Sequence, residues 1–235
     1  MGFVVLPALT PDVSAVYDVY FAAFKNNAVT RALFPSATEA DLTDPNSEFR
    51  KGHTAHVVDW SKTSQTQYTL KCVDTETNRI VGMALFDVYI TPSDWKRGEL
   101  SWLQGKEREQ AEALISPLWE AREKLWMNEK YIYAHVMAVH PDFQRKGVGQ
   151  LIFDYGTTIS RQTGLPVYVE SSKEGIKFYE KVGCKRLKET LRRVTNTDRP
   201  VNGDDAKSDD ELPLFVWLPE GGEKMLPEAV ELALD

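Results

Sequence analysis

The sequence predicts an α/β (α+β) fold in which helices flank a mixed sheet. Apolar residues alternate over several short segments, as they do in half-buried strands. The segment from Val148 to Ile159 instead repeats apolar residues at helical spacing. Strand patterns come early in the chain and alternating strand and helix patterns follow, as in βαβ units. The 235 residues show no internal repeat or low-complexity linker, so we expect one domain over 1–235.

Two cap-and-proline pairs organise the first quarter of the chain. Thr10-Pro11 and Asp44-Pro45 each place a capping residue before a proline, whose missing N–H costs nothing at the first helical position. We therefore expect a strand over 3–9 and helices over 11–25, 28–34 and 44–61.

A hairpin and an insertion follow. Alternation from Tyr68 to Cys72, the polar turn 74–78 and an apolar run over 79–90 predict two paired strands, with a bulge at Gly82. Residues 91–129 are Trp-rich, charged and largely helical in pattern, and Pro117 should kink or split the helix. This helical insertion is interpreted as a helix pair packed on the core, as a lid over an acceptor pocket, or as both.

The second half of the chain carries the strand and helix alternation. Ser171 or Ser172 can cap one helix, and Gly183 can close it. The expected elements are a central strand over 131–139, a helix over 148–163, a strand over 165–170, a helix over 173–181, a strand over 184–194, a solvated loop over 195–210, a strand over 212–218 and an acidic tail over 219–235 with one short helix.

A basic, glycine-bearing loop joins the central strand to the next helix. It runs from Gln144 to Gly149 and lies at a helix N-terminus, where backbone N–H groups and the positive end of the dipole favour an anion. Gly147 and Gly149 let a diphosphate approach the backbone, and Arg145 and Lys146 add positive charge. The patterns of a P-loop and of a Rossmann turn are absent from the sequence.

Gln144, Gly147 and Gly149 match the pattern Gln/Arg-x-x-Gly-x-Gly/Ala, and a second signature follows at 178–183. In these motifs the chain resembles the GNAT (Gcn5-related) N-acetyltransferase superfamily, most firmly over 131–190. The resemblance implies a mixed, mostly antiparallel central sheet flanked by helices, with the helical insertion placed before the central strand. It also implies acetyl-CoA as co-substrate, with the pantetheine arm paired to the backbone of the central strand. The cofactor-binding residues expected from it are Met137, Ala138, Val139, Gln144, Arg145, Lys146, Gly147, Val148, Gly149, Gln150 and Ser172.

The same resemblance suggests the catalytic groups. Tyr179 occupies the position of a tyrosine that serves as general acid toward the departing thiolate. His135 lies in a strand similar to that of arylalkylamine N-acetyltransferases, and an imidazole accepts a proton near neutral pH. That subfamily has a second histidine where this chain has Tyr133, so Glu170 or a water molecule stays open as the base. The expected reaction is direct attack by a primary amine of a small molecule in a ternary complex.

Composition narrows the partners. A net charge of −7 argues against nucleic acid or an anionic membrane as a partner. Two distant cysteines make neither a disulfide framework nor a metal site, and the N-terminus lacks a signal-peptide pattern. We expect a cytoplasmic monomer or homodimer without a metal. Two other functions stay open: acetylation of protein lysines or N-termini, and a non-catalytic CoA-binding sensor.

Overall fold

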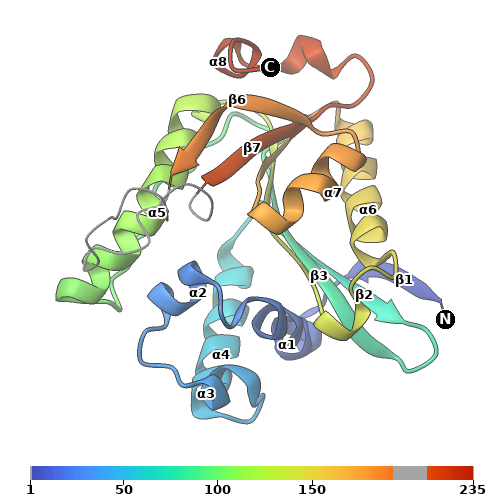
Figure 1. The fold of residues 1–235 in the computed structure, drawn as a ribbon. Helices are drawn as coiled ribbons and strands as arrows, with labels where there is room; N and C mark the ends of the chain where they lie inside the picture. The colour runs from blue at the N-terminus through green and yellow to red at the C-terminus, as the bar shows by residue number, and fades with distance from the viewer. Residues whose placement is uncertain (1, 193–210, 235) are drawn as a thin grey trace. The chain divides into compact units, whose positions relative to one another are not determined.

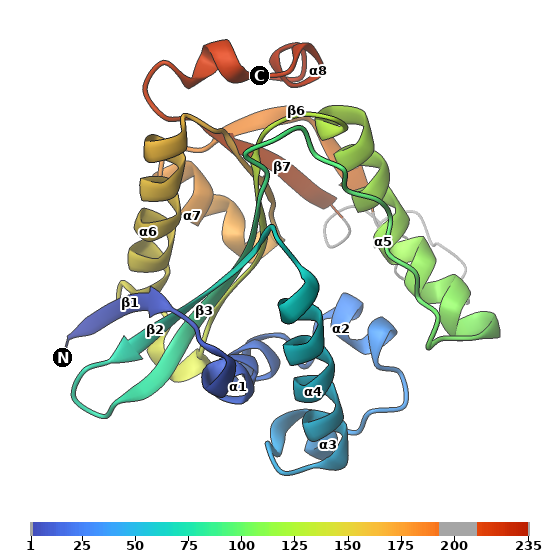
Figure 2. The same cartoon turned by 180° about the vertical axis from the view of Figure 1, so that it is seen from behind.

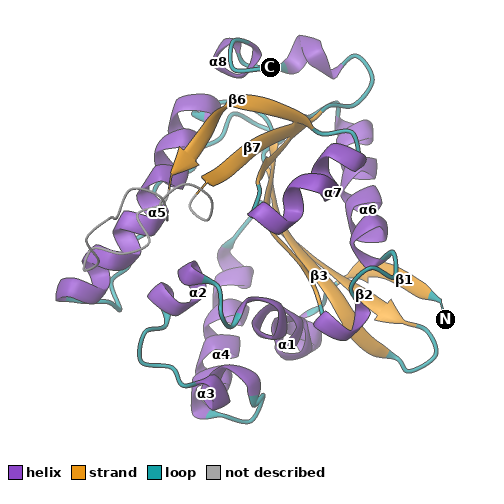
Figure 3. Cartoon of the chain, viewed as in Figure 1, coloured by secondary structure: helices purple, strands orange, loops and turns teal. Residues whose placement is uncertain are grey.

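The computed structural model describes residues 2–192 and 211–234. They form two compact units, one of residues 2–88 and 133–159 and the other of residues 89–132, 160–192 and 211–234. Both contain strands with flanking helices, and the strand pairs described below are antiparallel (Figure 3). The predicted α/β class with a mostly antiparallel sheet is therefore confirmed.

The first unit is built on a hairpin. Its strands lie in the order β1, β2, β3, β4, and β2 pairs antiparallel with both β1 and β3. The register shifts between Cys72 and Val73, which face Gly82 and Ile80, so Val81 is the extra residue of a bulge. The bulge predicted at Gly82 is thus confirmed one residue away. The strands are β1 (Phe3–Pro7), β2 (Gln67–Asp74), β3 (Arg79–Val88) and β4 (Ile132–Val139).

Gly82 also sets how closely a helix approaches β3. A Cβ added there would come within 2.6 Å of Val148 and 2.7 Å of Ile152, both at the start of α6 (Val148–Thr163). A larger residue would push these side chains away. The glycine therefore positions the N-terminus of α6 against the strand.

The other helices of this unit lie toward the N-terminus of the chain. Val16 and Val19 of α1 pack against Met83 and Leu85 of β3. Figure 2 shows α3 beside α4, near α1. The helical segments are a 3-10 turn (Thr10–Asp12), α1 (Val13–Phe24), α2 (Ala28–Leu33), α3 (Glu39–Thr43) and α4 (Glu48–Thr63).

Both cap-and-proline predictions misplace the start of a helix. Thr10 opens a 3-10 turn instead of capping α1, since the Asp12 carboxylate accepts from the N–H of Leu9 at 2.8 Å. The prediction of a helix from Asp44 is also wrong. The Ser47 hydroxyl accepts from the N–H of Arg50 at 3.1 Å and caps α4, while Asp44 ends the short α3 that the sequence analysis missed.

The second unit has the strand order β5, β7, β6, with β7 antiparallel to both neighbours. Figure 1 shows the C-terminal segment running past β6, and there the N–H of Lys188 donates to the carbonyl of Ala233 at 2.7 Å. The tail, with its predicted short helix, is therefore packed onto the unit. The elements are α5 (Gly105–Trp126), β5 (Val167–Glu170), a 3-10 turn (Lys173–Gly175), α7 (Ile176–Lys181), β6 (Lys185–Arg192), β7 (Glu211–Trp217), a 3-10 turn (Gly222–Met225) and α8 (Glu228–Glu231).

The insertion contains one helix where a pair was predicted. Residues 91–104 form no helix, and α5 continues through Pro117 without splitting. Buried residues on both sides of the proline explain the continuity, because their burial outweighs a cost of about 3 kcal/mol for the lost hydrogen bond. Among them, the Arg122 guanidinium donates to the hydroxyls of Tyr131 (2.7 Å) and Tyr89 (3.1 Å). The loop predicted over 195–210, like the end of the strand predicted to reach 194, lies outside the described residues.

Candidate active site

The loop before α6 has the backbone of an anion site. Arg145 and Gly147 adopt positive φ angles of 60° and 90°. Left-handed residues of this kind turn backbone N–H groups toward one concave side. The first helical hydrogen bond runs from the N–H of Leu151 to the carbonyl of Gly147 at 3.1 Å. The N–H groups of residues 148–150 therefore have no carbonyl within the helix to bond, which leaves them available to an anion.

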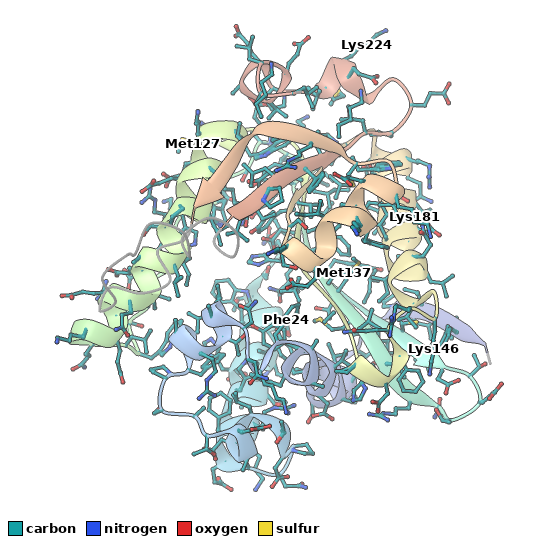
Figure 4. All side chains as sticks on the ribbon, in the orientation of Figure 1. Phe24, Met127, Met137, Lys146, Lys181 and Lys224 are labelled. Carbon is teal, nitrogen blue, oxygen red and sulfur yellow. The ribbon has the colours of Figure 1, made fainter. Side chains whose placement is uncertain are left out.

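The side chains around this backbone fit a diphosphate. Nothing lies within 4 Å of a Cβ built on Gly147, so an incoming group has room. Arg145 and Lys146 are exposed, and the Lys146 ammonium lies 4.9 Å from the centre of the Phe143 ring. Figure 4 labels Lys146 in this loop. The donor set is cationic and rich in N–H groups, as a phosphorylated ligand requires.

Three other residues of the expected site hold the loop itself. The side-chain amide of Gln144 donates to the carbonyl of Val139 at 3.3 Å, which ties the loop to the end of β4. Val148 is buried against the bulge of β3. Gln150 donates to the carboxylate of Asp154 at 2.9 Å, within α6. In the structure these three side chains shape the loop, and a direct contact with a ligand stays a prediction for each.

His140 braces the same loop. A guanidinium can only donate, so Nε2 of His140 accepts from Nη2 of Arg79 at 2.8 Å. On the other side of the ring, Nδ1 lies 3.3 Å from the backbone N–H of Asp142. Burial, and next the charge of Arg79, lower the pKa of His140. The ring therefore stays neutral and is held in place.

His135 lies on β4 with a carboxylate beside it. Its Nε2 lies 3.5 Å from Oδ2 of Asp87 on β3, and its ring centre lies 4.6 Å from that of Tyr133. The His135 side chain is 42% exposed, whereas that of Asp87 is 10% exposed. The structure thus brings an exposed imidazole and a buried carboxylate together, and a role for His135 as the base stays a prediction.

The backbone expected to pair with pantetheine follows His135 on β4. Met137 and Val139 are half-buried, while Ala138 packs in the cluster formed with α1. Figure 4 labels Met137 on this strand. The pairing of Met137–Val139 with a cofactor arm stays a prediction.

Tyr179 and Ser172 belong to the second unit. The Tyr179 ring packs 5.8 Å from that of Phe215, and burial raises the pKa of its phenol above the ordinary value. The phenol is therefore protonated at neutral pH. Ser172 precedes the 3-10 turn, and its carbonyl accepts from the hydroxyl of Ser171 at 2.7 Å. Cys184, which directly follows the second signature, is buried, and burial raises the pKa of its thiol to about 12.

No group of three His, Cys, Asp or Glu side chains in residues 2–192 and 211–234 is arranged to hold a metal ion. Within the same residues, every helix is too short or too polar to span a bilayer.

Comparison with known proteins decides the family. The model of the "Acetyltransferase (GNAT) domain" matches residues 111–185. The chain is also 31% identical over 133 residues to a protein of Ajellomyces capsulatus described as "Probable acyltransferase SID5", covering 55% of this chain and 85% of that one. This chain belongs to the GNAT acetyltransferase family. It is accordingly an acyltransferase, and the family implies acetyl-CoA as its co-substrate.

Solved structures agree with this GNAT fold. The polyamine N-acetyltransferase of Drosophila melanogaster has a TM-score of 0.60 at 14% identity, with 92% of this chain and 100% of that chain covered. The structure described as "mosquito arylalkylamine N-Acetyltransferase like 5b" has a TM-score of 0.56 at 14% identity, with 92% of this chain and 100% of that chain covered. At such identities the likeness shows the fold alone.

The sequence analysis missed two residues that contact histidines of the candidate site region. Asp87 stands beside the candidate base, and its signal was a carboxylate within an otherwise apolar strand segment, Ile80–Val88. Arg79 holds His140 and lies 5.6 Å from the centre of the Phe143 ring. Its position at the start of a hairpin strand gave no signal, because only the fold brings it to a loop 60 residues later.

Proposed function

We propose that this GNAT protein transfers the acetyl group of acetyl-CoA to a primary amine of a small molecule, by direct attack in a ternary complex. The loop from Gln144 to Gly149 carries the proposal. Its two left-handed residues, its exposed cations and the helix start behind it fit the diphosphate of a CoA ester. Structural neighbours named for polyamines and arylalkylamines support a small amine as the acceptor.

The chain supplies two proton movements in this reaction. His135 takes the proton that the ammonium must lose before it attacks, and its exposure makes it accessible to an amine. Tyr179 gives a proton to the departing thiolate, the general-acid role expected from its position in the second signature. Acetyl-CoA supplies the thioester. Backbone N–H groups of Met137–Val139 polarise its carbonyl.

Direct attack is favoured over an acyl-cysteine pathway. Cys72 and Cys184 are both buried, and burial raises the pKa values of their thiols to about 11 and about 12. A nucleophilic cysteine needs a lowered pKa and access to solvent. Free buried thiols also support a reducing compartment, so we propose that the protein is cytoplasmic. We further propose that it acts as a monomer or homodimer.

The test is release of CoA thiol with a panel of polyamines, arylalkylamines and lysine peptides. We expect saturable turnover with at least one small amine, and Tyr179→Phe should lower kcat by about 10²-fold or more without changing the affinity for acetyl-CoA. Tyr155→Phe, which removes a phenol on α6 outside the site, is the matched control. Turnover with peptides alone would favour a protein acetyltransferase. Tight acetyl-CoA binding without any turnover would contradict the enzymatic proposal.

A further inference from the structure

A cavity of about 560 Å³ lies within the first unit, and none of the loop residues 144–149 lines it. One wall is α1, which places Ala15, Val19 and Ala22 at helical spacing on the same face. The start of β3 and His140 form another wall. Small side chains on the helix leave the space open, and a volume of this order accommodates a small organic molecule. None of the residues assigned to acetyl transfer lines this cavity.

Two ionised side chains line the cavity, and only one of them has a counter-charge. The Asp18 carboxylate pairs with the Arg50 guanidinium at 2.6 Å, which balances its charge. Arg79 instead contacts two neutral groups, Nε2 of His140 at 2.8 Å and the ring of Phe143, whose centre is 5.6 Å away. Within residues 2–192 and 211–234, no carboxylate lies at ion-pair distance from Arg79. The cavity therefore carries one unbalanced positive charge.

We propose that this cavity binds a small organic carboxylate, whose charged group pairs with Arg79 and whose apolar part lies against α1. The site is separate from the loop that we assign to acetyl-CoA, so the proposal goes beyond the proposed function and does not depend on it. Val19 of α1 and Ile80 of β3 supply the apolar contacts.

The donors of Arg79 suit this ligand. A guanidinium carries five N–H groups in a fixed fork, and the contact with His140 engages only Nη2. Nε and Nη1 remain to bind both oxygens of a carboxylate, the bidentate geometry that arginine favours. The Arg79 residue is exposed, so a ligand can reach it. One unbalanced positive charge matches a monoanion, which favours a carboxylate over a phosphate ester with its charge near −2.

His140 reports whether the cavity is occupied. Burial, and next the charge of Arg79, lower its pKa, whereas the carboxylates of Asp142, 3.6 Å from Nδ1, and of Asp18 act in the opposite direction. An anion on Arg79 offsets the guanidinium charge and adds a negative charge beside the ring. Both effects favour the imidazolium, so binding should raise the pKa of His140.

NMR titration of the full-length protein with benzoate tests the proposal without acetyl transfer. Benzamide, which has the same shape and no charge, is the control ligand. We expect benzoate to shift the backbone signals of Ala22 and Ile80 saturably, and to raise the midpoint of the His140 titration by about 0.3 pH unit or more. Benzamide should do neither. His140→Gln assigns the imidazole signal among the four histidines.

Two variants and a matched control place the ligand. Arg79→Gln should weaken benzoate binding by about tenfold or more, because it removes a charge-assisted bidentate contact. Ala22→Phe should abolish the saturable shifts, because the larger ring fills the cavity while Arg79 is kept. Arg108→Gln should change nothing, since Arg108 is an arginine of α5 whose guanidinium is already paired with Glu112 at 2.7 Å.

A last titration separates this cavity from the acetyl-CoA loop. With acetyl-CoA in excess, the benzoate shifts at Ala22 and Ile80 should persist. Their loss would place the anion in the acetyl-CoA site and overturn the proposal. Equal binding of benzamide, or full benzoate binding by folded Arg79→Gln and Ala22→Phe, would overturn it too. If neither variant folds, the wild type decides: saturable shifts with benzoate and none with benzamide support the site, and no saturable shift with benzoate overturns it.

Discussion

Arg50 of α4 donates to the carboxylate of Asp18 of α1 at 2.6 Å, from a side chain that is only 1% exposed. The same guanidinium donates to the carbonyls of Leu42 (3.1 Å) and Ser14 (3.2 Å). It also lies 4.7 Å from the centre of the Phe21 ring. One buried cation thus ties α4 to α1 and to the end of α3.

Replacing this cation should destabilise the first unit. Arg50→Met keeps the length of the side chain but leaves two carbonyls without their donor, so we expect a loss of about 2–4 kcal/mol in the free energy of unfolding. Lys51→Met, at the exposed next position of α4, should change it by less than about 0.5 kcal/mol. Urea unfolding of both variants measures the difference. Equal midpoints would show that the Arg50 contacts contribute nothing.

His53 should make stability depend on pH. Burial, then the charge of Arg50 and that of His56, lower its pKa from 6.5 to about 4. The unfolded state therefore binds a proton that the folded state refuses, so stability is complete above about pH 6.5 and falls as the pH drops toward 4. The shift corresponds to about 3 kcal/mol at most.

Substitution isolates this contribution. His53 lies among aromatic rings, 5.1 Å from Phe21 and 6.2 Å from Phe49 between ring centres, so phenylalanine fits the site. We expect His53→Phe to flatten the unfolding free energy between pH 4 and 6.5, relative to wild type, and the exposed His56→Gln to retain most of the slope. If both variants kept the full wild-type slope, the pH dependence would have another origin.

These contacts show where sequence patterns succeed. The helix from Val148 was predicted because its apolar residues repeat at helical spacing and the loop before it is polar, both local signals. The start of α4 was misplaced because two local caps, at Asp44 and at Ser47, compete, and only the hydrogen bond from the N–H of Arg50 decides between them. Continuity through Pro117 depends on burial of Arg122 and its neighbours, which no local pattern contains.

The candidate site also contains residues that the sequence could identify and residues that it could not. The anion loop is continuous in sequence, so its residues could be named in advance. The partners of its two histidines could not, because Asp87 and Arg79 come from a strand about 50–60 residues earlier and meet them only through pairing of β3 with β4. Charged residues that meet across neighbouring strands are far apart in sequence, so the spacing of residues along the chain does not predict such pairs.

The cysteines should be inert in the folded protein. Burial raises the pKa values of Cys72 and Cys184 to about 11 and about 12, and only a thiolate reacts rapidly with a disulfide reagent. At pH 8 we expect negligible colour with a chromogenic disulfide in native buffer and two thiols per chain in denaturant. Rapid reaction of one native thiol would reopen the acyl-cysteine pathway.

Calorimetric titration of acetyl-CoA tests the central claim, the anion loop, most directly. Three glycine variants separate charge from strain: Gly147→Asp, Gly147→Ala, and Gly164→Asp just past the other end of α6, where φ is also positive at 73° and a Cβ also meets nothing within 4 Å. We expect one-site binding by the wild type and by Gly164→Asp, weaker binding by Gly147→Ala, and none detectable by Gly147→Asp, whose carboxylate would repel a diphosphate. Undiminished affinity in folded Gly147→Asp, or no binding by the wild type, would contradict the assignment of this loop.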